Sequence, residues 1–471
     1  MIGEGNIVID TIGLPDFAGK SDPKYIVLIQ SIREAIRSGR LKPGTKMPPV
    51  RELAWEFGIT PGTVARAYKL ATDEGLVEAA VGRGTFVTGA PQLAPPPPEP
   101  LIGLAQTDLL DFRAARVPEV GQSAAIRTVL RQLGQMQDAP YLDYPTSQTD
   151  LAARQQVVRW IGPERAGRLV ADDIVLGLGA QNTVMMALQA CLHGASPVVL
   201  TEGLAYPGVR HAARLLRAQL IGVEIDQEGL RPDRLEEALR RHGGQVLLLS
   251  PHAHSPTTAR MSLERRQRIG DIARRYQLQI IEDDCHVINR PDMPTFRAIC
   301  PERGWLVSSL TKSVSAALRF GFAACPAEQA STARQVAQST FYGLPQPVLD
   351  LCAELIRSGE AERIRDLVER EVAHRVQIAV NILGQWDIKW RTDVSFVWLR
   401  LPQGWRGSTF AMACEAEGLR IKPADEFAPP DGAAPHAVRL TLNAIAEQSA
   451  LEDGLRRISA LLSRPPVNVD F

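Results

Sequence analysis

One lysine near the middle of the chain stands where an amine can bond to a carbonyl compound. Lys312 follows the apolar run Trp305-Leu306-Val307 and a serine-rich turn that includes Ser309, and Arg319 comes seven residues later. A hydroxyl, an amine and a guanidinium that converge at one turn can hold a phosphate and an aldehyde together. These residue types therefore indicate imine chemistry with a phosphorylated aldehyde.

Three further segments carry the other groups that this chemistry needs. Asp283 ends an apolar strand-like run, where its carboxylate would keep a pyridine nitrogen protonated. Tyr206 is placed to stack on the ring, and Gly179, Ala180 and Gln181 precede a helical pattern whose first amides favour an anionic phosphate. Each residue alone has an ordinary role, as a solvated lysine, a helix cap or a glycine turn. The set together predicts pyridoxal 5'-phosphate as a cofactor.

The segments that must position these residues alternate in type along the chain. β-branched or leucine-rich runs are followed by stretches with helical period, which predicts a mostly parallel α/β sheet covered on both faces. From about residue 346 long helical patterns precede an alternating strand at 395–400, which predicts a smaller α+β lobe. The predicted strands are 173–177, 197–200, 246–249 and 280–283, and the predicted helices are 183–193, 209–216 and 263–276.

The first 88 residues predict a separate unit of three helices and a hairpin. Apolar residues from Tyr25 to Ile36 recur at helical spacing, and Pro49 is suited to begin a second helix. After a turn at Gly58, Thr60 is a candidate cap for a third helix that starts at Pro61. The third helix has a polar side with Thr63, Arg66 and Lys69, which suits reading base edges in a major groove, and the segment 82–87 predicts a hairpin with Arg83 at its tip.

The length of the chain and a run of prolines indicate how it divides into domains. Its 471 residues exceed what one hydrophobic core usually serves, and the consecutive prolines at 95–98 predict an extended spacer. We therefore expect a DNA-binding domain at 21–88, a linker at 89–105 and a second domain at 106–465. Lys plus Arg and Asp plus Glu both total 53, so net charge does not indicate a nucleic-acid partner.

The first unit is only mildly basic. Between residues 20 and 87 there are 11 Lys and Arg against 7 Asp and Glu. Non-specific affinity for DNA depends on how many phosphates the protein neutralises, so one copy is expected to bind DNA only modestly. We therefore expect a dimer that binds paired half-sites.

The remaining composition favours a cytoplasmic protein. The start of the chain lacks the features of a secretory signal, and no apolar run is long enough to span a bilayer, so no membrane partner is expected. The six cysteines have no paired spacing, which suits reduced thiols.

The run from residue 24 to 87 resembles the GntR-family winged helix over its whole length. The shared segments are Pro48-Pro49-Val50-Arg51-Glu52-Leu53-Ala54, the segment from Gly58 to Tyr68 and the Gly82-Arg83-Gly84-Thr85-Phe86-Val87 wing. The resemblance implies that a double-stranded DNA operator is the partner. It also implies the DNA contacts, which are Arg51, Thr60, Thr63, Arg66 and Arg83.

The order and spacing of the cofactor candidates over 140–325 resemble fold-type I aminotransferases. With the winged helix, nearly the full chain resembles the MocR subgroup of GntR regulators. That resemblance implies a head-to-tail homodimer in which the second domain senses an amino acid or amine through an imine at Lys312. It also implies that Arg439 grips an effector carboxylate and that Tyr144 reaches the neighbouring subunit's phosphate, although Thr149 replaces the glycine usual five residues after that tyrosine.

Two departures from the aminotransferase pattern affect groups that tune the cofactor. Ser255 stands where relatives commonly have an asparagine that contacts the ring hydroxyl, and His286 stands where they have a tyrosine. Ser255 is too short to donate from the same place, and His286 would exchange a phenol for an imidazole that titrates near neutrality. The hypothesis is that cofactor binding survives while transamination is slow or lost, so enzyme activity is an open question.

Three alternatives remain open from the sequence. One is a working aminotransferase that carries a DNA-binding module, and another is a DNA-binding protein whose second domain is a dimerisation scaffold without cofactor. The third is a zinc site made by His252, His254, Cys285 and His286, which is disfavoured because these residues lie where the cofactor ring is expected. Arg439 suggests an effector with a carboxylate, and taurine-like or diamino ligands are also open.

Overall fold

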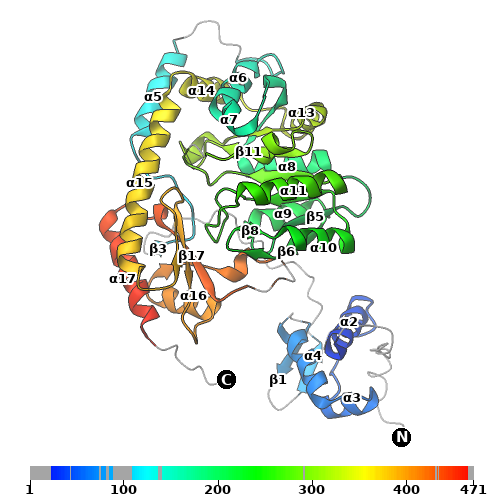
Figure 1. The fold of residues 1–471 in the computed structure, drawn as a ribbon. Coiled ribbons are helices and arrows are strands. Elements are labelled where there is room, and N and C mark those ends of the chain that lie inside the picture. Colours follow the sequence, from blue (N-terminus) through cyan, green and yellow to red (C-terminus); the bar gives the residue numbers. More distant parts are fainter. Residues whose placement is uncertain are drawn as a thin grey trace. The chain divides into compact units, whose positions relative to one another are not determined.

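The computed structural model describes residues 23–42, 44–73, 76–80, 84–87, 109–135, 141–289, 292–429, 432 and 434–464. The chain divides into two compact units, residues 1–103 and residues 104–471. Figure 1 shows the helices and strands of both units, which are described separately below. The predicted linker and Arg83 lie outside the described residues.

The first unit has three helices followed by a two-stranded antiparallel sheet. Strand β2 also forms a bridge to Lys46 through Phe86. Pairing in the sheet runs from Val77 opposite Val87 to Ala80 opposite Gly84. The elements are α2 (Lys24–Arg37), α3 (Val50–Glu56), α4 (Pro61–Asp73), β1 (Val77–Ala80) and β2 (Gly84–Val87).

The start of α4 and its packing follow from local sequence. The backbone N–H of Thr63 donates to Thr60 Oγ1 at 3.2 Å, so Thr60 caps the helix that Pro61 begins, as predicted. Val64 and Tyr68 are buried against the apolar side of α2 and α3. Tyr68 satisfies its buried hydroxyl by donating to the carbonyl oxygen of Pro48 at 2.8 Å.

A seven-stranded sheet forms the large lobe of the second unit. Its strand order is β4-β12-β11-β10-β9-β5-β6, and all neighbours pair in parallel except those of β12. The strands are β4 (Ile174–Leu178), β5 (Val198–Glu202), β6 (Gln219–Val223), β9 (Val246–Leu249), β10 (Gln279–Asp283), β11 (Gly304–Ser309) and β12 (Phe320–Ala324).

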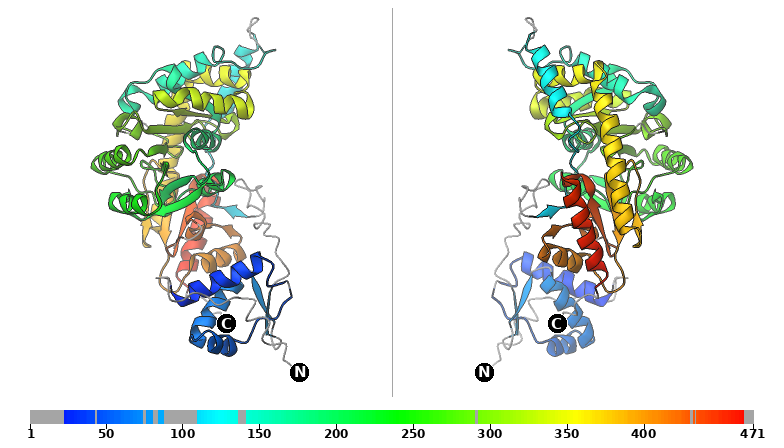
Figure 2. Two further views of the ribbon diagram at one scale, coloured as in Figure 1. Left: turned by 90° about the vertical axis from the view of Figure 1, so that its right-hand side faces the viewer. Right: turned by 90° about the vertical axis from the view of Figure 1, so that its left-hand side faces the viewer.

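Helices cover both faces of this sheet because its strands carry apolar side chains in both directions. On β9, for example, Val246 and Leu248 join one apolar cluster while Leu247 and Leu249 join another. The first cluster includes α8 (Ala180–Cys191), α9 (Pro207–Leu215) and α13 (Ala330–Phe341); the second includes α10 (Pro232–His242), α11 (Leu263–Tyr276) and α12 (Phe296–Ile299). Figure 2 shows these layers edge-on.

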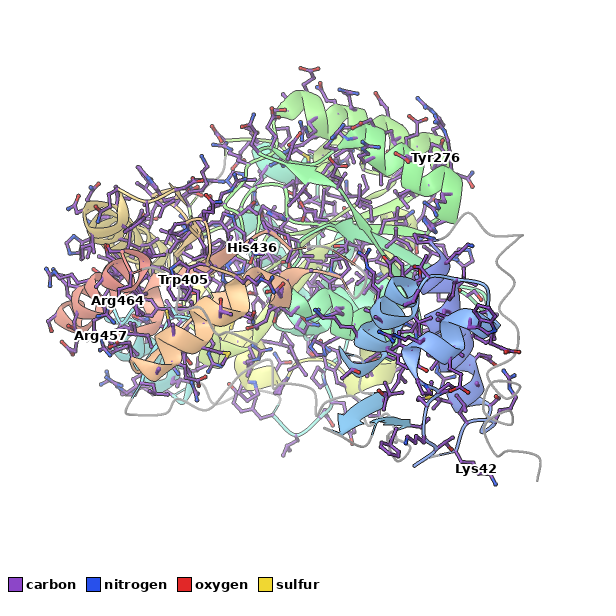
Figure 3. The ribbon with its side chains drawn as sticks, turned by 90° about the horizontal axis from the view of Figure 1, so that it is seen from below. Lys42, Tyr276, Trp405, His436, Arg457 and Arg464 are labelled. Atoms are coloured by element: carbon purple, nitrogen blue, oxygen red, sulfur yellow. The ribbon has the colours of Figure 1, made fainter. Side chains whose placement is uncertain are left out.

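The small lobe is a four-stranded antiparallel sheet packed against helices. Its order is β13 (Ile388–Lys389), β14 (Phe396–Arg400), β17 (Ala437–Thr441) and β16 (Lys422–Pro423). The 24-residue α15 (Glu360–Leu383) runs beside it (Figures 1 and 2). Trp405 Nε1 donates to the carbonyl oxygen of Arg464 at 3.3 Å, which fastens the end of the last helix; both residues are labelled in Figure 3.

The remaining elements surround the two lobes. Strand β3 (Leu110–Asp111) pairs in parallel with β15 (Leu419–Arg420), and β7 (Ile225–Asp226) pairs with β8 (Gly229–Leu230). The other helices are α5 (Gln122–Leu133), α6 (Leu151–Ile161), α7 (Pro163–Ala166), α14 (Gln346–Arg357), α16 (Gly407–Ala416) and α17 (Gln448–Leu462), and the 3-10 turns are η1 (Ala171–Asp173), η2 (Ala316–Leu318), η3 (Ala327–Gln329), η4 (Ala424–Phe427) and η5 (Leu442–Ala444).

The predicted architecture, with a mostly parallel sheet in the large lobe, is confirmed. The exception to parallel pairing is β12, which is antiparallel to both of its neighbours. The ten residues between β11 and β12 are too few for the crossover that a parallel pair needs, so the chain turns back. This turn contains Lys312. Among the described residues no helix is long and apolar enough to cross a membrane.

Tyr68→Phe is expected to destabilise the first unit by about 1–2 kcal/mol, because the carbonyl of Pro48 loses its buried donor. Hydrogen exchange, measured by mass spectrometry on the full chain, is expected to be faster in the peptide that covers α4 of the Tyr68→Phe variant. Tyr25→Phe is the matched control, with an expected effect within about 0.5 kcal/mol. Equal exchange in the two variants contradicts the assignment.

Candidate functional site

Most of the sequence-predicted cofactor residues lie at one edge of the large sheet. Strands β4, β5, β9, β10 and β11 all end at this edge, because they are parallel. The residues that follow them include Gly179, Tyr206, Ser255 and Lys312, and Asp283 is the last residue of β10. The carboxyl ends of parallel strands are the usual place for a ligand in such a sheet.

Lys312 projects from the turn between β11 and β12. Its Nζ donates a hydrogen bond to the carbonyl oxygen of Ala115. Burial lowers the pKa of the Lys312 ammonium; the charges of Arg439 and Arg319 lower it further, while Cys285 and Asp283 act in the opposite direction. A lysine whose pKa is lowered is more often an unprotonated amine and therefore a better nucleophile toward a carbonyl carbon.

Asp283 is a buried carboxyl group with little local compensation. Its Oδ1 accepts from the backbone N–H of Cys285 at 3.1 Å. Burial raises its pKa, whereas the hydrogen bonds from Cys285 and the charge of Lys312 lower it. A buried carboxylate of this kind is stabilised by a cationic partner, and a protonated ring nitrogen would be one.

Gly179 and Gly321 make a cradle that no larger residue fits. Gly179 has a φ of 80° immediately before α8, and a Cβ on Gly321 would lie 2.4 Å from the carbonyl carbon of Gly179. Arg319, with a φ of 47°, donates from Nη2 to the carbonyl oxygen of Leu178 at 2.8 Å. Helix amides and a guanidinium are thus held together, as an anionic phosphate requires.

Hydroxyl and amide groups complete this cradle. Ser309 Oγ accepts from the backbone N–H of Thr311 at 3.3 Å, and Thr311 Oγ1 is buried with no partner in the described part of the chain. Gln181 Nε2 donates to the carbonyl oxygen of Gly208 at 3.1 Å, so its side chain is occupied. Ala180 and Gln181 accordingly offer the first amides of α8 rather than a side chain.

Tyr206 lies among the same charged groups, directly before α9. Burial raises its pKa to about 12, with smaller contributions from Cys285 and Asp283 in the same direction. Its phenol is therefore neutral and able to donate at ordinary pH.

Arg439 connects the small lobe to the large lobe. From β17 it donates through Nη1 to Ser255 Oγ at 2.9 Å and through Nη2 to the carbonyl oxygen of Arg113 at 2.9 Å. Its guanidinium carbon lies 5.2 Å from the ring centre of Phe396 and 4.9 Å from that of Phe427. Burial lowers its pKa to about 10, so it stays charged near neutrality, and its Nε has no partner among the described residues.

His286 does not have the titration behaviour expected from the sequence. It is buried, and its ring meets the ring of Phe396 edge-on at 5.2 Å between centroids. Burial, with the charges of Lys312 and Arg439, lowers its pKa well below the ordinary value. The expectation of titration near neutrality is therefore wrong, because an imidazolium there would be desolvated beside two cations.

The histidines of the alternative zinc site face different partners. His254 shares hydrogen bonds with Thr257 Oγ1 at 2.6 Å and with the carbonyl oxygen of Leu204 at 2.9 Å. Burial lowers its pKa to about 4 and that of His252 to about 2. Within the described ranges no group of three His, Cys, Asp or Glu residues is placed to hold a metal.

The other predicted residues belong to segments outside this edge of the sheet. Tyr144 is exposed, and its ring packs on Tyr342 with 5.3 Å between centroids. In the first unit Arg51 is exposed on α3, and the hydroxyls of Thr60 and Thr63 are 2.9 Å apart at the start of α4. The guanidinium of the exposed Arg66 lies 4.4 Å from the ring centre of Tyr25.

Sequence reasoning missed the segment after β3 and the two rings around Arg439. Arg113 and Ala115 contribute carbonyl oxygens to Arg439 and Lys312. Carbonyl groups carry no residue-type signal, so the sequence offers none here. Phe396 was detectable as the first residue of an alternating strand, whereas Phe427 lies in a 3-10 turn without a clear pattern.

Comparison with known families matches both units. Residues 24–87 match the family described as bacterial regulatory proteins, gntR family. Residues 99–458 match the family described as aminotransferase class I and II.

Relatives of similar length span both regions. The chain is 28% identical to the uncharacterized HTH-type transcriptional regulator YdeF of Bacillus subtilis, over 95% of this chain and 96% of that protein. It is 25% identical to the HTH-type transcriptional regulator TauR of Rhodobacter capsulatus, over 92% and 96%. It is also 25% identical to the vitamin B6 salvage pathway transcriptional repressor PtsJ of Salmonella typhimurium, over 89% and 94%.

Solved structures share the fold of the second unit. Kynurenine aminotransferase of Pyrococcus horikoshii superposes with a TM-score of 0.68 at 19% identity, covering 76% of this chain and 91% of that one. The α-aminoadipate aminotransferase LysN of Thermus thermophilus gives a TM-score of 0.67 at 22% identity, covering 76% and 92%.

Gly321→Ala is expected to cost about 1–3 kcal/mol of stability, because its Cβ meets backbone that cannot move aside. Urea unfolding of the second unit measures this. Gly134→Ala is the control, since its nearest contact is the carbonyl oxygen of Leu130 at an ordinary 3.4 Å. Equal midpoints for the two variants contradict the close packing of Gly321 on Gly179.

His286 is expected to remain neutral from about pH 5.5 to about pH 7.5, roughly one unit either side of the pKa of an ordinary histidine. Because its pKa is lowered, protonation would begin only on further acidification. The ¹⁵N shifts of labelled histidine, with His286→Gln to assign the signal, measure this directly. An inflection near pH 6.5, about the ordinary value, would overturn it.

Proposed function

Because this chain belongs to the aminotransferase class I and II family and carries a gntR-type regulatory domain, we propose that it is a DNA-binding transcription regulator that senses a small amine. This pairing of domains is the MocR arrangement, and pyridoxal 5'-phosphate is its cofactor. In the proposal the effector is an amino acid or a related amine. The regulator acts in the cytoplasm on a double-stranded operator.

The convergence of Lys312 and Asp283 beside the glycine cradle carries this proposal. The lowered pKa of Lys312, the buried carboxyl of Asp283 and the unpartnered Thr311 hydroxyl fit an electrophilic, phosphorylated pyridine. When bound, the cofactor supplies an electrophilic carbon and an electron-withdrawing ring. Lys312 would be the residue that bonds to that carbon, and the carboxylate of Asp283 would keep the ring nitrogen protonated.

The remaining proposed contacts fall into two groups, those to the cofactor's phosphate and those to its ring. The proposed phosphate contacts are the amides of Gly179, Ala180 and Gln181, the hydroxyl of Ser309 and the guanidinium of Arg319, with Tyr144 reaching the phosphate of the neighbouring copy. Tyr206 and His286 flank the ring, and the neutral phenol of Tyr206 is the better donor.

Arg439 is the proposed carboxylate receptor of the effector. Its Nε has no partner in the described region, and the rings of Phe396 and Phe427 restrict approach to the edge of the guanidinium. A carboxylate there forms charge-assisted hydrogen bonds while Ser255 and Arg113 hold the other nitrogens in place. The effector thereby contacts both lobes.

Slow transamination follows from the same contacts. The Ser255 hydroxyl is engaged with Arg439, and the buried neutral His286 lies edge-on to Phe396. In the proposal neither group therefore supplies the contacts of the asparagine and the phenol that it replaces. The second candidate function is a working aminotransferase, which the family membership favours.

The first unit is the proposed DNA reader. Arg51, Thr60 and Arg66 are exposed on α3 and at the start of α4, and Thr63 is partly exposed. Arg83 is proposed as the wing contact. Because the basic excess of the unit is small, a head-to-tail homodimer with two readers is proposed to bind paired half-sites.

Borohydride trapping tests the covalent assignment. Residues 104–471 contain only three lysines, at 312, 389 and 422, so peptide mapping is unambiguous. The cofactor adduct is expected on Lys312 and is expected to persist in the control variant Lys389→Ala. Absence of an adduct on Lys312 in the unaltered chain contradicts the cofactor role.

Operator binding by Lys312→Ala tests the sensing role. The unaltered chain is expected to change its operator affinity with one member of a panel of amino acids, diamines and aminosulfonates. The variant is expected to bind operator DNA but not to respond, because the effector cannot exchange with Lys312. A retained response in the variant, or rapid keto-acid formation without any operator response, would favour the rival functions.

A further inference from the structure

A pocket lies between the two lobes of the second unit, and none of the proposed cofactor contacts is among its lining residues. Its volume is about 560 Å³, within the usual range for small-molecule sites. The large lobe contributes the segments 203–204, 224–227 and 257–260, and the small lobe contributes residues 389–391, Trp398, Arg400 and Pro435. We call it the interlobe pocket.

The strand pattern of the small sheet places aromatic and basic groups on the same wall. Val397 and Leu399 pack into the main core, so the alternate residues Trp398 and Arg400 face the other way, toward the large lobe. Lys389 on β13 is directly opposite Trp398, so both lie on one face of the sheet. Figure 3 labels His436, the neighbour of Pro435 at this side of the small lobe.

Two cations of this wall have no acidic partner in the described part of the chain. These are Lys389 and Arg400, both exposed. The other cations of the pocket are neutralised, since Arg260 pairs with Asp292 and Arg391 with Asp393.

The acids of the opposite wall are also engaged elsewhere. Glu224 forms ion pairs with Arg231 and Arg234, at 2.7 Å and 3.1 Å. Asp226 pairs with Arg265 at 2.6 Å. The charge left uncompensated in the pocket is therefore positive.

Flat apolar surface completes the lining. Trp390 is 42% exposed, so its indole offers a flat apolar surface at the pocket. Trp398 is buried against Leu204, with Ile225 of the large lobe packed on the same cluster. An apolar ring enters such a site more favourably than a bare inorganic anion does.

The pocket shares one wall with the proposed effector site. Thr257, which lines the pocket, is two residues from Ser255, and Ser255 binds Arg439. Trp398 is the direct cross-strand neighbour of Arg439. A ligand in the pocket therefore touches the two segments that hold Arg439.

We propose that the interlobe pocket is a second ligand site, which binds a small organic anion with an attached aromatic ring. The anionic group binds Lys389 and Arg400, and the ring packs on Trp390. Because the ligand contacts both lobes, it stabilises the arrangement of the lobes in which it can touch both walls of the pocket at once. The proposal rests on the pocket alone and not on the regulatory function.

Isothermal titration of the cofactor-loaded full chain tests this site with phenyl phosphate and benzoate as probes. Inorganic phosphate and benzyl alcohol serve as the two half-ligands. We expect saturable binding of both aryl anions, with each half-ligand about tenfold weaker or more. Lys389→Gln combined with Arg400→Gln is expected to weaken aryl-anion binding at least about tenfold.

Two control variants distinguish binding in the interlobe pocket from binding elsewhere on the chain. Arg268→Gln removes one exposed cation on α11, outside the pocket, and is expected to bind the probes as the unaltered chain does. Trp390→Leu is expected to reduce the advantage of phenyl phosphate over inorganic phosphate. Retention of the cofactor absorbance shows that the variants are folded.

The proposal is overturned if neither aryl anion binds, or if the double variant binds both probes as tightly as the Arg268→Gln control. It is also overturned if the probes displace the cofactor, because they would then occupy the phosphate cradle. None of these measurements uses DNA or an amine, so a failure here is distinct from a failure of the proposed regulatory function.

Discussion

A single buried guanidinium joins the two lobes of the second unit. Arg439 belongs to the small sheet, yet its hydrogen bonds go to Ser255 of the large lobe and to the carbonyl of Arg113. A buried cation without such acceptors would be strongly unfavourable, so these bonds fix how the lobes meet. Burial makes the largest contribution to the shifted pKa values of Lys312, Tyr206 and His286, and the charge of Arg439 contributes to all three.

The sequence predicted the parts of the site that depend on contiguous residues. Lys312 and Arg319 lie on one short turn, and the glycines before α8 mark a helix start, so spacing alone brings these groups together. The rest depends on contacts between distant segments. The partner of Ser255 is 184 residues away, and the titration of His286 is set by burial against Phe396, which no local pattern encodes. The alternating pattern did not predict the antiparallel direction of β12, because that direction depends on the length of one turn and not on residue periodicity.

Several buried titratable groups near the cofactor residues are uncharged and so do not contribute to the electric field there. Burial raises the pKa of Glu202 to about 8 and lowers that of His254 to about 4, so the pair, 3.4 Å apart, is uncharged near neutrality. The same effect keeps the Cys285 thiol protonated, because burial raises its pKa. The charges that act on Lys312 are therefore those of Arg439 and Arg319 on one side and that of Asp283 on the other. This arrangement suits an anionic cofactor and an anionic effector group, and it does not suit a metal cation.

Sensing requires that a ligand bind one arrangement of the protein more tightly than another. Contacts made within one lobe cannot supply that difference, because they are the same whichever way the lobes are arranged. In the proposed function Lys312 and Asp283 hold the cofactor, and both belong to the large lobe, so their contacts would not discriminate between arrangements. Arg439 contacts both lobes, and so do the walls of the interlobe pocket. A regulator of the proposed kind would therefore obtain its discriminating free energy at these contacts, and a second ligand that touches both lobes would be coupled to the first through the same equilibrium.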